Sequence, residues 1–226
     1  GDSVAEKVSS TLRALLGPEI QLREGQARAG NLKAWTFFAR GEKSRKDAEP
    51  VAGSDSARAA GLLAQADSLL EQAVQADPQW IDPIVLRGEV AIQNARLDKD
   101  KVEKDKWYQA GTQHAEEALK LDPVNARALA LRGTLRYAQW RLNLGTDAEV
   151  RKALLTSAAK DLQDAVNTDG TLAAAYATLS SVDYDLKDVP SGLQHARSAY
   201  LADRFLGNAD LILSRLFWAN HDLEQF

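Results

Sequence analysis

One pattern of residues recurs several times along the chain. Residues 118–137 (ALKLDPVNARALALRGTLRY) align without a gap to residues 73–92 (AVQADPQWIDPIVLRGEVAI) and 165–184 (AVNTDGTLAAAYATLSSVDY), so the copies begin 45 and 47 residues apart. A partial earlier copy ends in FARG at Gly41, where the two later copies read LRG. Self-similarity at such a period indicates stacked units of secondary structure, each of which buries its apolar face only against the next.

The composition excludes several classes of protein. Of the 226 residues, 45% are hydrophobic and 27% charged, as is ordinary for a chain with an apolar core. The net charge of −4 comes from 28 basic and 32 acidic residues, a balance that disfavours nucleic acid and anionic membranes as partners. The absence of cysteine excludes zinc ribbons, disulfide frameworks and thiol catalysis. No apolar run approaches ~18 residues, so we expect no insertion into a membrane.

Apolar residues at helical spacing predict four pairs of helices joined by short links, and short links make neighbouring helices antiparallel. Inside the pairs we expect breaks at residues 50–54, 98–101, 143–146 and 188–191. Ser54 or Ser56 is the expected N-cap of the helix that resumes at Ser56. Thr146 and Glu149 have the spacing of a capping box, and Pro190 suits the first turn of a helix.

These patterns give three segments. Residues 1–30 are expected to form a lead-in or the end of an upstream domain, with a helix at 3–16 and a strand-like stretch at 19–24. Residues 31–204 hold four repeats, and residues 205–226 hold an incomplete fifth that begins with a helix at 209–219. The chain starts at Gly1 and contains no methionine, which favours a piece of a longer protein.

Small residues mark the place where the two helices of each unit are expected to cross. In chain order the pairs are Gly41 with Ala66, Gly88 with Gly111, Gly133 with Ala158, and Ser180 with Gly192. With the bulky residues that precede them and Pro78 or Pro123 after the second helix, they resemble the tetratricopeptide repeat family, a helix–turn–helix unit of about 34 residues. The resemblance implies an all-α fold of helix–turn–helix repeats stacked in a right-handed superhelix.

The spacing of these small residues predicts unusually long helices. The two crossing residues are 12 apart in the fourth unit, as in the family, but 25, 23 and 25 apart in the first three. The difference of 11 to 13 residues is about three helical turns. Shared between two helices, it lengthens each helix of the first three units by about one and a half turns.

The chain departs from the family where arginine replaces leucine beside the first small residue, at Arg40, Arg87 and Arg132. Two interpretations are open. The arginines form a ladder that binds acidic or phosphorylated segments, or each pairs with a carboxylate or with helix carbonyls of a neighbouring helix.

The resemblance also implies that the first helices line a concave surface where ligands bind. The residues that it places there are Trp35, Phe38, Glu42 and Arg45; Asp82, Val85, Glu89 and Gln93; Arg127, Thr134 and Tyr137; Ser181, Tyr184 and Asp185; and Asn208, Leu211, Arg215 and Trp218. Mixed charge with aromatic residues suits a peptide or a protein helix. The alternative for Tyr137 and Tyr184 is packing between adjacent helices. The family sub-type that clamps a terminal carboxylate is disfavoured, because Phe38, Glu42, Val85 and Glu89 occupy its binding positions.

The sequence predicts no catalytic residue, cofactor or metal site. Asp98 and Asp100 resemble half of a calcium loop, but its glycine and distal glutamate are missing. Trp107, Tyr108 and Trp140 form either a second contact patch near the loops or a cap on the extended core.

The expected function is therefore a non-catalytic module that binds a protein or peptide in the concave groove. Self-association through the incomplete repeat is one alternative, and a sensory or regulatory region of a larger kinase-like or receptor protein is another. The compartment is open, since either the cytoplasmic or the extracytoplasmic part of a larger bacterial protein fits a soluble domain.

Overall fold

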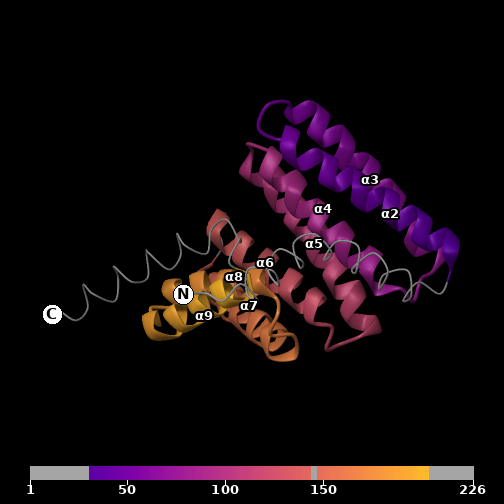
Figure 1. Cartoon of the computed structure of the whole chain (residues 1–226). Coiled ribbons are helices and arrows are strands. Elements are labelled where there is room, and N and C mark those ends of the chain that lie inside the picture. The colour runs from indigo at the N-terminus through magenta and orange to yellow at the C-terminus, as the bar shows by residue number, and fades with distance from the viewer. Residues whose placement is uncertain (1–30, 144–146, 204–226) are drawn as a thin grey trace, which may run out of the picture. The chain divides into compact units, whose positions relative to one another are not determined.

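The computed structural model describes residues 31–143 and 147–203, and within these ranges it contains helices and no strand. The α-helices are α2 (Leu32–Ala48), α3 (Ser56–Ala76), α4 (Ile81–Leu97), α5 (Lys101–Leu121), α6 (Ala126–Leu142), α7 (Ala148–Thr168), α8 (Ala173–Asp185) and α9 (Val189–Ala202), with a short 3₁₀ helix at Glu49–Val51 (Figure 1). The predicted all-α class of helix–turn–helix repeats is confirmed.

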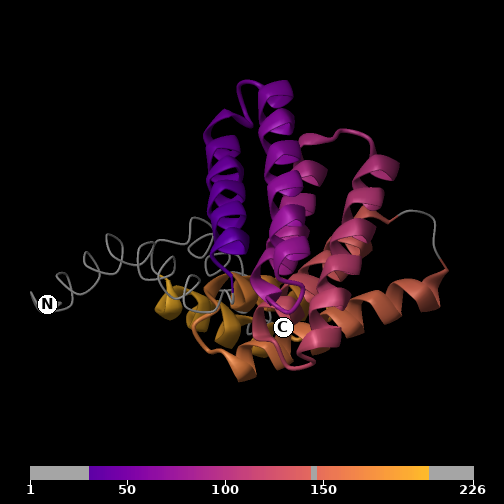
Figure 2. The same cartoon turned by 90° about the vertical axis from the view of Figure 1, so that its right-hand side faces the viewer.

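The contacts divide the chain into two compact units between Arg87 and Gly88, inside α4. In the first unit, α2 and α3 lie side by side along their length (Figure 2). In the second unit α6 packs on α7 and α8 on α9, and α5 packs on α6 as α7 does on α8. Its core is a cluster contributed by α6, α7 and α8, which includes Leu155, Leu162, Leu179 and Val182.

Close crossings hold each hairpin together. A methyl group at Gly133 would lie 2.7 Å from Leu162 Cγ and 3.1 Å from the Ala158 carbonyl oxygen. In the fourth hairpin serine takes the place of glycine, and the buried Ser180 hydroxyl donates to the carbonyl of Gly192 at 2.8 Å. Small residues therefore recur because backbone meets backbone at this point, as the sequence predicts.

The helices of the first three hairpins are longer than those of the fourth. They have 17 and 21 residues in α2 and α3, α4 and α5, and α6 and α7, against 13 and 14 in α8 and α9. The predicted lengthening is confirmed, but the equal sharing is wrong. The first helix of each pair gains about one turn and the second about two.

The expected breaks at 50–54 and 98–101 fall between α2 and α3 and at the junction of α4 with α5, but the fourth lies at residues 186–188 rather than 188–191, because α9 begins at Val189. Most of the third, 143–146, lies outside the described residues. Aspartates cap the helices that follow the breaks. Asp55 precedes α3 and accepts the backbone N–H of Arg58 at 2.9 Å, so neither Ser54 nor Ser56 is the N-cap. Asp147 precedes α7 and accepts from Glu149 N at 2.9 Å. A carboxylate caps as well as a hydroxyl and also favours the positive end of the helix dipole. Pro190 lies in the first turn of α9 as predicted.

Several sequence predictions lie outside the described residues. They are the helix at 3–16, the strand-like stretch at 19–24, the capping role of Thr146, and the incomplete fifth repeat.

Candidate protein-interaction surface

A hydrogen bond joins the first helices of the third and fourth hairpins. The Tyr137 hydroxyl on α6 donates to Asp185 Oδ2 on α8 at 2.7 Å, and Tyr137 is only 9% exposed. Its ring stacks on Trp140, with centroids 5.8 Å apart. Burial, and then the hydrogen bond to Asp185, raise the pKa of Tyr137 well above its usual range. Tyr137 therefore packs between adjacent helices and fixes α6 against α8.

Tyr184 lies one residue before Asp185 and has a different environment. Its side chain is 44% exposed, and the Lys187 ammonium lies 5.8 Å from its ring centroid. An exposed tyrosine next to a fixed neighbour offers a large apolar face that loses little conformational freedom on binding.

The remaining predicted residues of the second unit supply charge and small hydroxyls. Arg127 on α6 donates to Glu89 Oε1 on α4 at 3.3 Å, and both side chains are more than a third exposed. The half-buried Ser181 donates its hydroxyl to the Ala177 carbonyl at 3.2 Å, and Thr134 and Gln93 are half-buried. These contacts bring Glu89 to Arg127, and Tyr137 to Asp185, on the first helices of neighbouring hairpins.

In the first unit, the predicted residues Phe38 and Asp82 both contact Trp80, which was not among the predicted residues. The rings of Phe38 and Trp80 lie 4.8 Å apart, and the Trp80 indole N–H donates to Asp82 Oδ2 at 3.0 Å. Val85 is buried. The indole N–H of Trp35 is buried and has no hydrogen-bond partner among the described residues.

Glu42 lies at the centre of a small ion-pair network on α2. It accepts from Arg45 Nε at 2.9 Å and pairs with Lys46 at 3.1 Å, while Arg45 also reaches Glu49 at 2.8 Å. Burial acts to raise the pKa of Glu42, but the hydrogen bonds and charges of Arg45 and Lys46 outweigh it, so this pKa lies below its ordinary value. Arg215 and Trp218, with Asn208 and Leu211, lie outside the described residues.

Two of the three repeated arginines pair with carboxylates. Arg87 donates to both carboxylate oxygens of Asp67 on α3, at 2.8 and 3.2 Å. Arg132 donates to both oxygens of Asp161 on α7, at 2.9 and 2.7 Å. For these two, the pairing interpretation holds. Arg40 forms no ion pair with any residue that the structure describes.

A second polar pair at the crossing escaped the sequence analysis. Arg136 donates to Asp161 at 2.6 Å in the third hairpin, and in the fourth, Asp183 Oδ2 and His195 Nδ1 are 2.7 Å apart. Both pairs occupy the positions three residues after the crossing residues of each helix, with the aspartate on the second helix in the third hairpin and on the first helix in the fourth. This shared spacing was the signal that could have identified them.

The aromatic residues near the loops divide into packed and exposed. Trp140 stacks on Tyr137, and the Arg151 guanidinium lies 5.8 Å from its ring centroid. Burial raises the pKa of Tyr108, against the opposing charges of Arg96 and Arg141. Trp107 is 39% exposed. Trp140 and Tyr108 thus cover the core of the extended helices, and Trp107 lies at its surface.

The carboxylates of Asp98 and Asp100 accept hydrogen bonds from backbone N–H groups. Asp98 accepts from the Asp100 N–H at 3.0 Å, and Asp100 caps α5 by accepting from Val102 N at 2.8 Å. Over residues 31–143 and 147–203, no three His, Cys, Asp or Glu residues are grouped as metal ligands. In the same ranges no helix combines the length and apolarity needed to cross a membrane.

Repeated hairpins that cross at small residues define a helical-repeat scaffold of the tetratricopeptide type. The chain is similar to a thermophilic TPR protein of Thermus thermophilus, with a TM-score of 0.63, 12% identity, and 94% of this chain and 96% of that chain covered. It is also similar to the MamA protein, with a TM-score of 0.52, 13% identity, and coverage of 84% and 83%. No protein-family model and no curated protein matches the chain. At these identities the likeness shows the fold, and that fold is TPR-like.

Proposed function

We propose that this protein is a non-catalytic interaction module and that a peptide or protein helix binds across the first helices of the second unit. The contact surface comprises α6, α8 and the part of α4 after Arg87. The array that presents it spans residues 31–204, with four repeats.

The observation that carries this proposal is the contrast between Tyr137 and Tyr184. The buried bond from Tyr137 to Asp185 fixes α6 against α8, while Tyr184 next to it remains exposed. On the same set of helices, the half-exposed Arg127 is held by Glu89 and can exchange that contact for a ligand carboxylate or carbonyl. A rigid platform with an exposed aromatic residue and an arginine is typical of the few residues that dominate binding energy.

The test uses the intact chain and a random peptide display library. Selected peptides are titrated against the wild-type chain and against the Tyr184→Ala and Arg127→Ala variants, each of which is expected to bind about tenfold more weakly or worse. Leu201→Ala is the control for the loss of an exposed apolar side chain, and Lys152→Ala for the loss of an exposed cation. If the controls weaken binding as much as the two test variants, or if the test variants bind as tightly as wild type, the proposed surface is wrong.

A further inference from the structure

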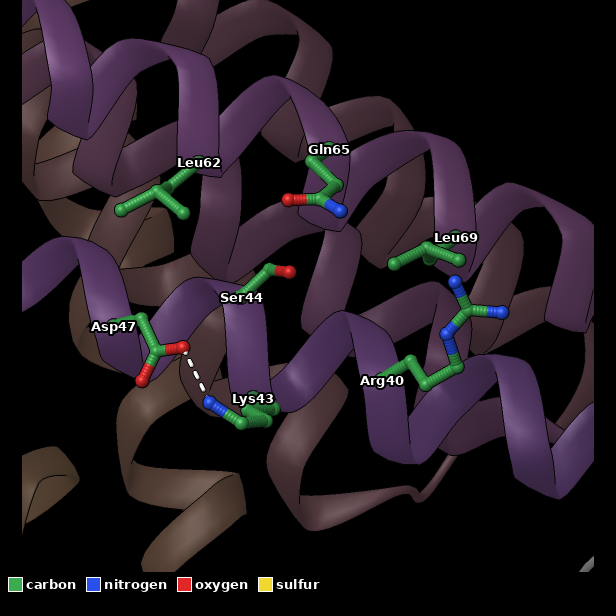
Figure 3. A pocket seen from close by; sticks show the side chains of 7 residues that line it. All are labelled: Arg40, Lys43, Ser44, Asp47, Leu62, Gln65 and Leu69. Atoms are coloured by element: carbon green, nitrogen blue, oxygen red, sulfur yellow. Dashed lines mark hydrogen bonds and ion pairs between the residues drawn. The ribbon is translucent and has the colours of Figure 1, made fainter.

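The first hairpin contains an open groove of about 250 Å³ between α2 and α3. Figure 3 shows its lining: α2 contributes Arg40, Lys43, Ser44 and Asp47, and α3 contributes Leu62, Gln65 and Leu69. All seven residues belong to the first unit.

Alignment of the repeats shows that the face of α2 at Lys43 differs from the equivalent face in the later hairpins. Lys43 lies two residues after the crossing glycine, where the later hairpins carry Val90, Leu135 and Val182. Those three side chains are at most 1% exposed, whereas the side chain of Lys43 is 76% exposed. Leu135 packs against Gly111 of the preceding hairpin. The face that receives a preceding helix in the third hairpin is therefore charged in the first, so it does not suit another repeat of the same kind.

Of the three repeated arginines, Arg40 is the one that has no carboxylate partner among the described residues. Arg132 takes Asp161 from its own hairpin, at a position that Leu69 occupies in the first hairpin. Arg87 takes Asp67 from the helix before it. Arg40 has neither among the described residues, and its guanidinium reaches across the groove toward Leu69 (Figure 3). Guanidinium groups are suited to bind carboxylates through two parallel hydrogen bonds, as both of its counterparts do.

The rest of the groove fits an acidic and apolar ligand. Leu62 and Leu69 supply an apolar wall, and the hydroxyl of the buried Ser44 makes no hydrogen bond with any described residue. Lys43 pairs with Asp47 at 2.6 Å, which leaves the charge of Arg40 as the net charge of the lining. An anionic group flanked by an apolar one would complement this arrangement.

We propose that the groove binds a segment of a partner protein in which an Asp or Glu side chain lies beside an apolar side chain. The carboxylate binds Arg40 with two hydrogen bonds, as Asp161 binds Arg132, and the apolar side chain packs on Leu62 and Leu69. This site is separate from the surface formed by α6 and α8 and shares no residue with it.

The experiment selects peptides from a random display library on the intact chain and sorts them by their dependence on Arg40. Peptides that lose about tenfold or more in affinity for the Arg40→Gln variant are expected to carry Asp or Glu next to a large apolar residue. Replacing that acidic residue by its amide should weaken binding to wild type by a similar factor. Arg40→Lys keeps the charge but loses the planar fork, so it should recover only part of the affinity.

Arg197→Gln is the matched control, because Arg197 is exposed on α9 and binding should be unchanged there. Circular dichroism of each variant checks that the helices remain. If no selected peptide depends on Arg40, or if the dependent peptides lack a carboxylate, the proposal is overturned. Peptides whose binding depends on Tyr184 and Arg127 are analysed separately. The groove at Arg40 and the surface at Tyr184 are therefore tested independently of each other.

A thiol-labelling measurement tests whether the groove is open to a partner. The chain has no cysteine, so the Lys43→Cys and Arg197→Cys variants each carry one reactive thiol. We expect similar labelling rates in the free chain, and about tenfold slower labelling of the Lys43→Cys variant when an Arg40-dependent peptide is bound. Strong protection of the Lys43→Cys variant without peptide would mean that the chain covers its own groove, which would overturn the assignment to a partner.

Discussion

At the crossing of α6 and α7, the missing side chain of Gly133 decides how closely the two backbones approach. A methyl group there would press on Leu162 Cγ at 2.7 Å and on a backbone carbonyl at 3.1 Å, and a carbonyl in a helix cannot rotate away. We expect Gly133→Ala to lower the free energy of unfolding by roughly 1–3 kcal/mol, measured by urea denaturation.

Gly61 is the matched control for that substitution. It lies inside α3, and a methyl group at this position would have no atom within 4 Å. Gly61→Ala should therefore raise the free energy of unfolding by roughly 0.5–1 kcal/mol through helix propensity alone. Equal effects at the two glycines would contradict the crossing model.

The network around Glu42 makes a pH-dependent contribution to stability. Because the pKa of Glu42 is lowered in the folded state, its contribution is present above the pKa of an unfolded glutamate, about 4.3, and is lost as the pH falls through the folded value. At neutral pH, Glu42→Gln should cost about 1 kcal/mol, and the difference from wild type should shrink at acid pH. Thermal unfolding of both chains between neutral and acid pH measures this difference, with Glu116→Gln on α5 as an exposed control.

Single residues also show what could be predicted from the sequence and what could not. The small residues at the crossings were predictable, since only they allow two backbones to meet and their spacing repeats. The partners of the polar residues were not, because Arg132 takes its carboxylate from the same hairpin and Arg87 takes it from the helix before. Several acidic side chains are spaced suitably for each arginine, and the packing of the helices decides which one is reached.

At the scale of a helix, aspartates determine where the second helices begin. Asp100 accepts from Val102 N at 2.8 Å and from Glu103 N at 3.1 Å. We expect Asp100→Ala to destabilise α5 by about 1 kcal/mol, whereas the Asp100→Ser variant should retain most of the stability. Chemical denaturation of the two variants measures this difference. A loss with serine as large as with alanine would show that the capping bond is not what stabilises the start of α5.

The sequence predicted the breaks between these helices but not every boundary. Ser54, Asp55 and Ser56 are all acceptable caps, and the choice depends on which residue first adopts helical geometry. The same uncertainty explains why the two helices of each long hairpin are lengthened unequally. Spacing between crossing residues gives only the total insertion, and the position of the loop divides it between the two helices.

At the scale of the whole molecule, the bond between Tyr137 and Asp185 couples one hairpin to the next. In a repeat array, stability is the sum of the intrinsic terms of each hairpin and the terms of the interfaces between neighbours. Tyr137→Phe removes the donor and leaves the ring, so it should lower the free energy of unfolding by about 1.5 kcal/mol and broaden the urea transition.

The raised pKa of Tyr137 gives an independent check of the same bond. A raised folded pKa means that its contribution is complete below the ordinary pKa of tyrosine, about 10, and disappears as the pH rises through the folded value. In an alkaline titration followed by ultraviolet absorbance, Tyr137→Phe should leave the tyrosines that ionise first unchanged. Loss of an early-ionising tyrosine in this variant would contradict the buried position.

Register assigns whole helices to the expected concave surface, but it does not determine which of their side chains remain available to a ligand. Phe38 and Asp82 were placed on the concave surface by register, yet both contact Trp80. Such pairing depends on rotamers that a repeat pattern does not encode. Register alone therefore does not identify which residues of a helix would contact a ligand.

Among the described helices of the second unit, the main contacts from α5 onward join each helix to the next one or to the one after it along the chain. A nascent polypeptide can therefore complete each hairpin soon after its second helix leaves the ribosome, without waiting for distant segments. Contacts this local favour rapid folding, and they leave little time for exposed apolar faces to meet other chains.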